Sequence, residues 1–180
     1  MPRRGTGGVG PHWAAMTKPD DAVAILVTEP REVPWLSVVF GFGPMVPFVG
    51  GAALAWADVA PGRAVWLDLT IIWASAICTF LAGVRRGVSF RTMGGPTLAQ
   101  MSTMLWLFCA GSGALVLWWL QHPSFALALL AAAYGSIGVL DPIAARSGQA
   151  PLFFARLRPV QMVAPVVSLL ALLVLVMRLR

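Results

Sequence analysis

The charged side chains best placed for chemistry in this sequence are one aspartate and four arginines at the edges of long apolar stretches. Asp141 ends one stretch, Arg85 and Arg86 end another, and Arg156 and Arg158 precede a third. A carboxylate at a membrane edge is costly unless a cation pairs with it. We therefore expect Asp141 to form a structural ion pair with one or more of these arginines. A proton or anion site is the alternative interpretation of the same residues.

Motifs for catalysis or for a bound cofactor are missing from the sequence. The run from Gly5 to Gly10 spells GxGxxG, but no strand precedes it and no helix follows it, as a dinucleotide site requires. Two histidines, His12 and His122, do not provide a haem-binding pair inside the apolar stretches. Neither Cys78 nor Cys109 belongs to a CxxC pair, so no zinc or redox motif is present. We expect no catalytic residue, no metal and no cofactor, and hence no enzyme.

Three aromatic residues, Trp73, Trp106 and Tyr134, fall near the middle of apolar stretches. Packing between helices is the common reason for large aromatic side chains at such positions. We therefore expect them to pack within the protein. A protein that contacts a quinone or a pigment through these rings is the alternative.

The elements that carry these residues must lie in a membrane. Hydrophobic residues make up 58% of the 180-residue chain and charged residues only 11%, against about 25% in soluble domains. The mean hydropathy is +0.79, which excludes a disordered chain as well. Five stretches approach the roughly 20 residues that cross a bilayer as a helix. These predicted spans are residues 35–56, 65–84, 98–120, 124–140 and 159–177. The predicted fold class is all-α, a polytopic bundle of about five transmembrane helices.

Composition and charge divide the chain and orient it. Residues 1–33 are rich in Gly, Pro and charge and are predicted to be a flexible cytoplasmic segment, followed by a transmembrane domain over residues 34–180. Positively charged residues favour the cytoplasmic side of a membrane. Ten of the 13 Lys and Arg residues fall on the N-terminal side, namely Arg3, Arg4, Lys18, Arg31, Arg85, Arg86, Arg91, Arg146, Arg156 and Arg158. The N-terminus is therefore predicted to be cytoplasmic, and the formal charge of +6 is read as an orientation signal and not as a nucleic-acid site.

Prolines and small residues in the spans predict how the helices bend and pack. Pro44 and Pro47 each remove a backbone donor from the first span, so we expect a helix break there. A kink that fits the helix to its neighbours is the favoured interpretation, and a broken helix lining a cavity is the alternative. Small residues at four-residue spacings allow helices to approach closely. The candidates for such packing are Gly51, Ala110, Ala131 and Gly135.

Two motifs resemble a known family. The first is Ile77-x-x-Phe80-Leu81-x-Gly83-x-Arg85-x-Gly87, and the second runs from Asp141 through Gly148, Pro151, Phe153 and Phe154 to Arg158. In order and spacing they resemble the domain-of-unknown-function family of bacteria and mitochondria that includes transmembrane protein 69. The resemblance covers residues 34–177 or so and implies a small polytopic inner-membrane protein without an assigned activity. It also implies that Asp141 and the Arg156 and Arg158 pair belong to one structural feature.

The function expected from these observations is that of a non-catalytic integral protein of the bacterial cytoplasmic (inner) membrane. It would serve as an accessory or assembly subunit of a larger bioenergetic complex, in contact with the lipid bilayer and with other membrane subunits or a second copy. A small transporter or channel is the alternative, and it would use the broken first span and the cluster around Asp141. Nucleic acid is not an expected partner.

Overall fold

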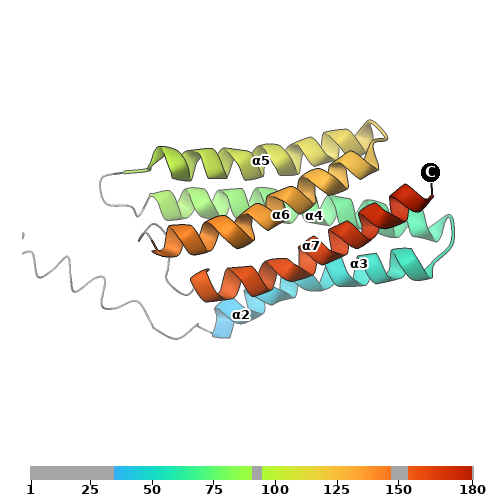
Figure 1. Cartoon of the computed structure of the whole chain (residues 1–180), viewed down its shortest axis with the longest axis horizontal. Helices are drawn as coiled ribbons and strands as arrows, with labels where there is room; N and C mark the ends of the chain where they lie inside the picture. The colour runs from blue at the N-terminus through green and yellow to red at the C-terminus, as the bar shows by residue number, and fades with distance from the viewer. Residues whose placement is uncertain (1–34, 91–94, 147–153, 180) are drawn as a thin grey trace, which may run out of the picture. The chain divides into compact units, whose positions relative to one another are not determined.

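The computed structural model describes residues 35–90, 95–146 and 154–179. Backbone contacts divide the chain into two units, residues 1–31 and 32–180, and the predicted N-terminal segment lies outside the described residues. All regular elements of the described part are helical (Figure 1). They are α2 (Trp35–Phe42), the 3-10 helix η2 (Gly43–Met45), α3 (Val46–Ala57), α4 (Gly62–Ser89), α5 (Leu98–Trp119), α6 (Pro123–Arg146) and α7 (Phe154–Arg178). Five of their segments are long and apolar enough to span a membrane, which confirms the predicted fold class.

The helices extend beyond several predicted spans. Helix α6 continues past Asp141 and Pro142 to Arg146, and α7 begins at Phe154, ahead of Pro159. The apolar stretch marks where the chain crosses hydrocarbon, whereas the helix itself continues into the polar boundary. Proline is tolerated inside such helices because neighbouring groups satisfy the carbonyl that loses its partner. The helix that carries Asp141 therefore extends beyond the apolar stretch that this residue ends.

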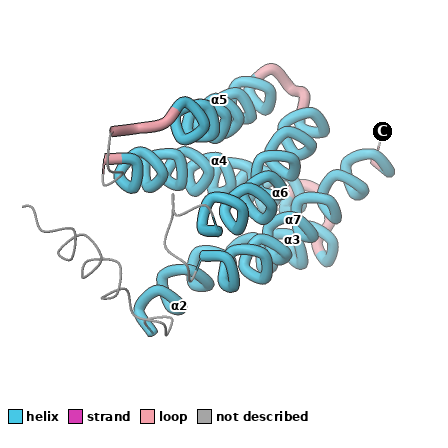
Figure 2. The backbone as a smooth tube through the Cα atoms, turned by 60° about the vertical axis from the view of Figure 1, so that its left-hand side comes forward, coloured by secondary structure: helices cyan, strands magenta, loops and turns pink. Residues whose placement is uncertain are grey.

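The five spans form an up-and-down bundle. Consecutive spans run antiparallel, and in both views α6 lies beside α7 and α4 beside α5 (Figures 1 and 2). These two pairs share the most extensive packing, while α3 packs on both α4 and α7 and so closes the ring. One end of the bundle, on the left in Figure 1, collects the start of α2, the end of α4, the start of α5, the end of α6 and the start of α7. We call it the arginine end, because Arg85 and Arg158 lie there.

The middle of the bundle is filled by an aromatic pair. Phe48 of α3 and Tyr134 of α6 are fully buried, with ring centroids 5.2 Å apart at an interplanar angle of 80°. The Tyr134 hydroxyl donates to the Ala74 carbonyl of α4 at 2.8 Å. A buried phenol without a partner would be destabilising, so this bond fixes the ring where three helices meet.

The first span breaks at its prolines. The α-helix gives way to η2 at Gly43, Pro44 lies in η2, and Pro47 lies in the first turn of α3. Side chains from two other helices reach carbonyls of this segment. Trp73 Nε1 of α4 donates to the Pro44 carbonyl at 2.9 Å, and Gln161 Nε2 of α7 donates to the Gly41 carbonyl. These bonds agree with a kink that is fitted to neighbouring helices.

The predicted packing residues fall into two groups. Gly51 lies directly against Thr70 of α4, and Ala110 and Ala131 are buried. Gly135 is different, because a Cβ added there would meet no atom within 4 Å, so no described helix of this chain approaches closely at this residue. Helix α5 also comes close to α4 at Gly111, where a Cβ would stand 2.9 Å from the Ser75 carbonyl oxygen.

Candidate functional site

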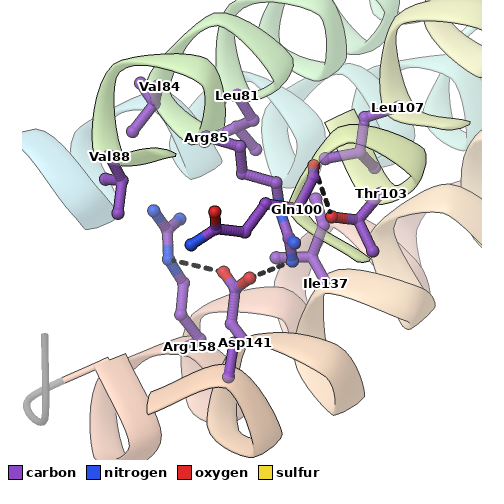
Figure 3. Close-up of a pocket in the computed structure, with 11 residues that line it drawn as sticks. Leu81, Val84, Arg85, Val88, Gln100, Thr103, Leu107, Ile137, Asp141 and Arg158 are labelled. Carbon is purple, nitrogen blue, oxygen red and sulfur yellow. Dashed lines mark hydrogen bonds and ion pairs between the residues drawn. The ribbon is translucent and has the colours of Figure 1, made fainter. Parts of the chain in front are cut away.

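The arginine end holds a buried ion cluster that three helices build. Asp141 of α6 lies between Arg85 of α4 and Arg158 of α7 (Figure 3). One carboxylate oxygen, Oδ1, accepts from Arg85 Nη2, and the other, Oδ2, is 3.2 Å from Arg158 Nε. Asp141 is only 6% exposed and Arg158 only 8%. We call these three residues the Asp141 cluster.

The cluster lies close to the polar boundary of the bundle. Arg85 is four residues from the end of α4 at Ser89, and Arg158 is four residues from the start of α7 at Phe154. Four residues of helix rise about 6 Å, so the charges are about one turn inside the helix ends. Such a depth lowers the cost of burying arginine compared with the bilayer centre. The arrangement is therefore suited to tying helices together near the membrane surface.

A small cavity adjoins the cluster on the side of α5. Its volume is about 40 Å³, and Gln100 and Thr103 of α5 line it together with Arg85, Asp141 and Arg158. The Gln100 side chain points toward the Arg158 guanidinium in Figure 3. About 10–15 Å³ of such volume suffices for one water molecule, so the cavity has room for a few. It is a local hollow at the cluster, far smaller than the pocket of a drug-sized ligand.

One of the four candidate arginines, Arg86, is not part of this arrangement. Arg86 Nη1 is 3.2 Å from Met101 Sδ, and its guanidinium lies 4.3 Å from the centroid of the Phe90 ring. Adjacent helical residues point about 100° apart, so Arg86 cannot share the direction of Arg85. The prediction that Asp141 pairs with one or more of these arginines is thus met by Arg85 and Arg158, and Arg86 is not a partner. The side chain of Arg156 lies outside the described residues.

The three side chains carry two positive charges and one negative charge. Of the seven acidic residues in the sequence, four precede residue 34, and Asp58 and Asp68 lie at the opposite end of the bundle. Asp68 there accepts a hydrogen bond from Trp118 Nε1 at 2.9 Å. Within the described part of the chain, Asp141 is thus the acid that balances the arginine end.

A second, larger cavity lies on the other side of Arg158. It has a volume of about 280 Å³ and lies between α2, η2, α4 and α7. Both cavities share Leu81, Val84 and Arg158. We call the larger one the lateral cleft. Its lining includes Phe40, Pro44, Ile77, Phe80, Leu157 and Gln161.

The three aromatic residues considered for a quinone or pigment have protein partners. Tyr134 is buried in the core, as described above. The ring nitrogen of Trp73 bonds to the Pro44 carbonyl, and that of Trp106 donates to Ser136 Oγ of α6 at 3.0 Å. Each ring therefore joins two helices, which favours the packing interpretation.

Metal and thiol chemistry find little support in the residues that the structure describes. Within them, no three His, Cys, Asp or Glu side chains come together as a metal site would require. Cys78 is buried, with Sγ 3.3 Å from the Leu107 carbonyl oxygen, whereas Cys109 is exposed. Both are free thiols.

Sequence reasoning missed two polar residues at this end. Gln161 of α7 donates a hydrogen bond to the Gly41 carbonyl of the first span. Gln100 faces the cluster, and its Oε1 accepts a hydrogen bond from the backbone nitrogen of Thr97 at the start of α5. A polar amide inside an otherwise apolar stretch was the available signal for Gln161. Gln100 stands in the first turn of its helix, where glutamine is common as a capping residue. Its position in the sequence therefore gave no sign that it also lines the cavity at the cluster.

No model of a known protein family matches this chain, and neither a curated protein nor a solved structure shows significant similarity to it. The resemblance to the family of transmembrane protein 69 thus remains a prediction from the motifs.

Proposed function

We propose that this chain is a non-catalytic integral membrane protein that serves as an accessory or assembly subunit of a larger membrane complex. Its membrane is the bacterial inner membrane, and its N-terminus and arginine end face the cytoplasm. The observation that carries the proposal is the pairing of Asp141 with Arg85 and Arg158. The most distinctive polar group of the spans is thereby committed to joining α4, α6 and α7.

The bundle interior beyond the cluster supports this proposal over transport. The largest fully buried side chains include Tyr134, Phe48, Ile71, Leu127 and Leu130. In the part of the chain that the structure describes, these side chains occupy the interior of the bundle between the cluster and the opposite end. A transport path from Asp141 would have to run through that interior. The cavity at the cluster has a volume of about 40 Å³, which is enough for a few waters and not for a path through the bundle.

Outward-facing surfaces supply the means of association. The span formed by α5 is apolar, yet only 22% of its residues are buried within the chain. Its exposed side chains include Leu105, Trp106, Phe108 and Val116. Packing and small-residue contacts drive helix association in membranes, so such a face suits another membrane subunit as well as lipid.

The substitution Asp141→Asn tests the structural role. It leaves two guanidiniums without their carboxylate, and removing one partner of a buried pair costs about 3–5 kcal/mol. We expect the variant to accumulate in membranes at a small fraction of the wild-type level, as measured by quantitative immunoblotting of the chromosomally tagged protein.

Asp68→Asn is the matched control, because asparagine can still accept the hydrogen bond from Trp118 Nε1 at the opposite end. We expect this variant to accumulate normally. If Asp141→Asn accumulates as the wild type does while the cell loses a solute flux, the cluster belongs to a transporter and the proposal fails.

A further inference from the structure

We propose that the lateral cleft binds one membrane phospholipid with an anionic head group. One acyl chain lies along the apolar wall of α4, and the head group lies at Arg158. This inference goes beyond the proposed subunit role and does not depend on which proteins the chain assembles with.

The walls of the cleft suit an acyl chain. Ile77, Phe80 and Val84 line it from α4, and Phe40 and Leu157 line it from α2 and α7. From Ile77 to Val84 the helix rises about 10 Å. The cleft volume of about 280 Å³ therefore holds part of one chain, and the rest of the lipid remains in the bilayer.

The mouth of the cleft lies on the side of the bundle, between the helices. Phe40 is 74% exposed and Phe80 is 64% exposed, and both lie within membrane-spanning segments. In a bilayer this mouth opens to hydrocarbon, so the molecule that enters must have an apolar part. Water is a poor filling, because an apolar cavity gives it few hydrogen-bond partners.

The positive charge beside the cleft, at Arg158, favours an anionic head group. Arg158 lines the cleft as well as the cavity at the cluster, and the cluster has two guanidiniums for one carboxylate. Basic pockets between transmembrane helices near the membrane surface attract anionic lipid head groups. The cluster lies about one helical turn, or about 6 Å, inside the helix ends.

A segment of the chain itself is the competing occupant. Asp20 and Asp21 followed by the apolar residues 22–27 would also combine negative charge with an apolar part. A phospholipid is favoured because the mouth, flanked by Phe40 and Phe80, opens toward the bilayer, where lipid is always present. The experiment separates the two.

The test uses the purified full-length protein in nanodiscs of phosphatidylglycerol or phosphatidylcholine with matched acyl chains. Lipids that stay bound after transfer to detergent are counted by native mass spectrometry. A single basic residue near the surface contributes about 1 kcal/mol, so we expect at least about a fivefold preference for phosphatidylglycerol. Ile77→Trp fills the cleft and should abolish this preference. Ile72→Trp, on the exposed face of the same helix, should retain it.

Photolabelling of the unaltered protein provides a second readout that needs no variant. Phosphatidylglycerol with a photoreactive acyl chain should label the part of α4 that contains Ile77 and Phe80. Equal retention of both lipids, an unchanged preference in Ile77→Trp, or labelling elsewhere would each overturn the proposal. A preference that appears only after Asp20→Asn and Asp21→Asn are combined would show that the chain's own segment occupies the cleft, and would overturn it too.

Discussion

At the scale of residues, the ion cluster depends on which way each arginine points. The sequence places four arginines and one aspartate at the same level, because all of them flank helix ends on one side of the membrane. That is enough to predict an ion pair. Arg85 and Arg86 point about 100° apart on their helix, so one of them at most faces Asp141. The rotation of α4 about its axis decides which arginine faces Asp141. That rotation is set by the packing of α4 against other helices, which one sequence alone does not reveal.

A pair of substitutions tests this choice. Arg85→Gln removes a charged hydrogen bond to Asp141 but leaves Arg158 in place, so we expect a loss of about 2 kcal/mol in the free energy of unfolding. Arg86→Gln removes a contact with the Phe90 ring, and we expect a loss below about 1 kcal/mol. Unfolding in mixed micelles measures both. Equal losses, or a larger loss for Arg86→Gln, would contradict the arrangement.

At the scale of elements, breaks and close approaches decide how the helices fit. The prolines predict where the first span breaks, because a missing N–H is visible in the sequence. They do not predict that Trp73 and Gln161 would bond to the carbonyls of Pro44 and Gly41, since those donors come from other helices. The four-residue spacing pointed to Ala110 on α5, and the spacing alone did not reveal that the neighbouring Gly111 lies against the backbone of α4.

The substitution Gly111→Ala tests the close approach of α5 to α4. Its Cβ would stand 2.9 Å from the Ser75 carbonyl oxygen and 3.2 Å from the Thr79 nitrogen, both of which are backbone atoms that cannot turn aside. Overpacking of this kind costs about 1–3 kcal/mol. We expect a lower melting temperature, measured by thermal denaturation in detergent.

Gly113→Ala is the control on the same helix. Its Cβ would meet the Leu129 side chain at 3.6 Å, an ordinary contact. Replacing a helical glycine by alanine gains about 0.5–1 kcal/mol, so this variant should melt at or above the wild-type temperature. A Gly111→Ala protein as stable as Gly113→Ala would mean that the two helices are farther apart than the structure has them.

At the scale of the whole molecule, the span number follows from hydrophobic length, but the order of helices in the ring does not. Short links make α4 a neighbour of α5 and α6 a neighbour of α7. The contact of α3 with α7, which closes the ring, joins segments that are far apart in the chain. The lateral cleft between α2, α4 and α7 follows from this closure and could not be read from the sequence. In each of the five spans, more than half of the residues are not fully buried within the chain.

Association with other membrane subunits is the central claim, and native migration tests it most directly. The full-length tagged protein would be extracted from its own membranes in a mild detergent and run on a native gel. Mass spectrometry would then identify what migrates with it, against an untagged strain as control. We predict migration within a large complex together with stoichiometric membrane-protein partners. Migration alone, or as a small homo-oligomer, would contradict the claim.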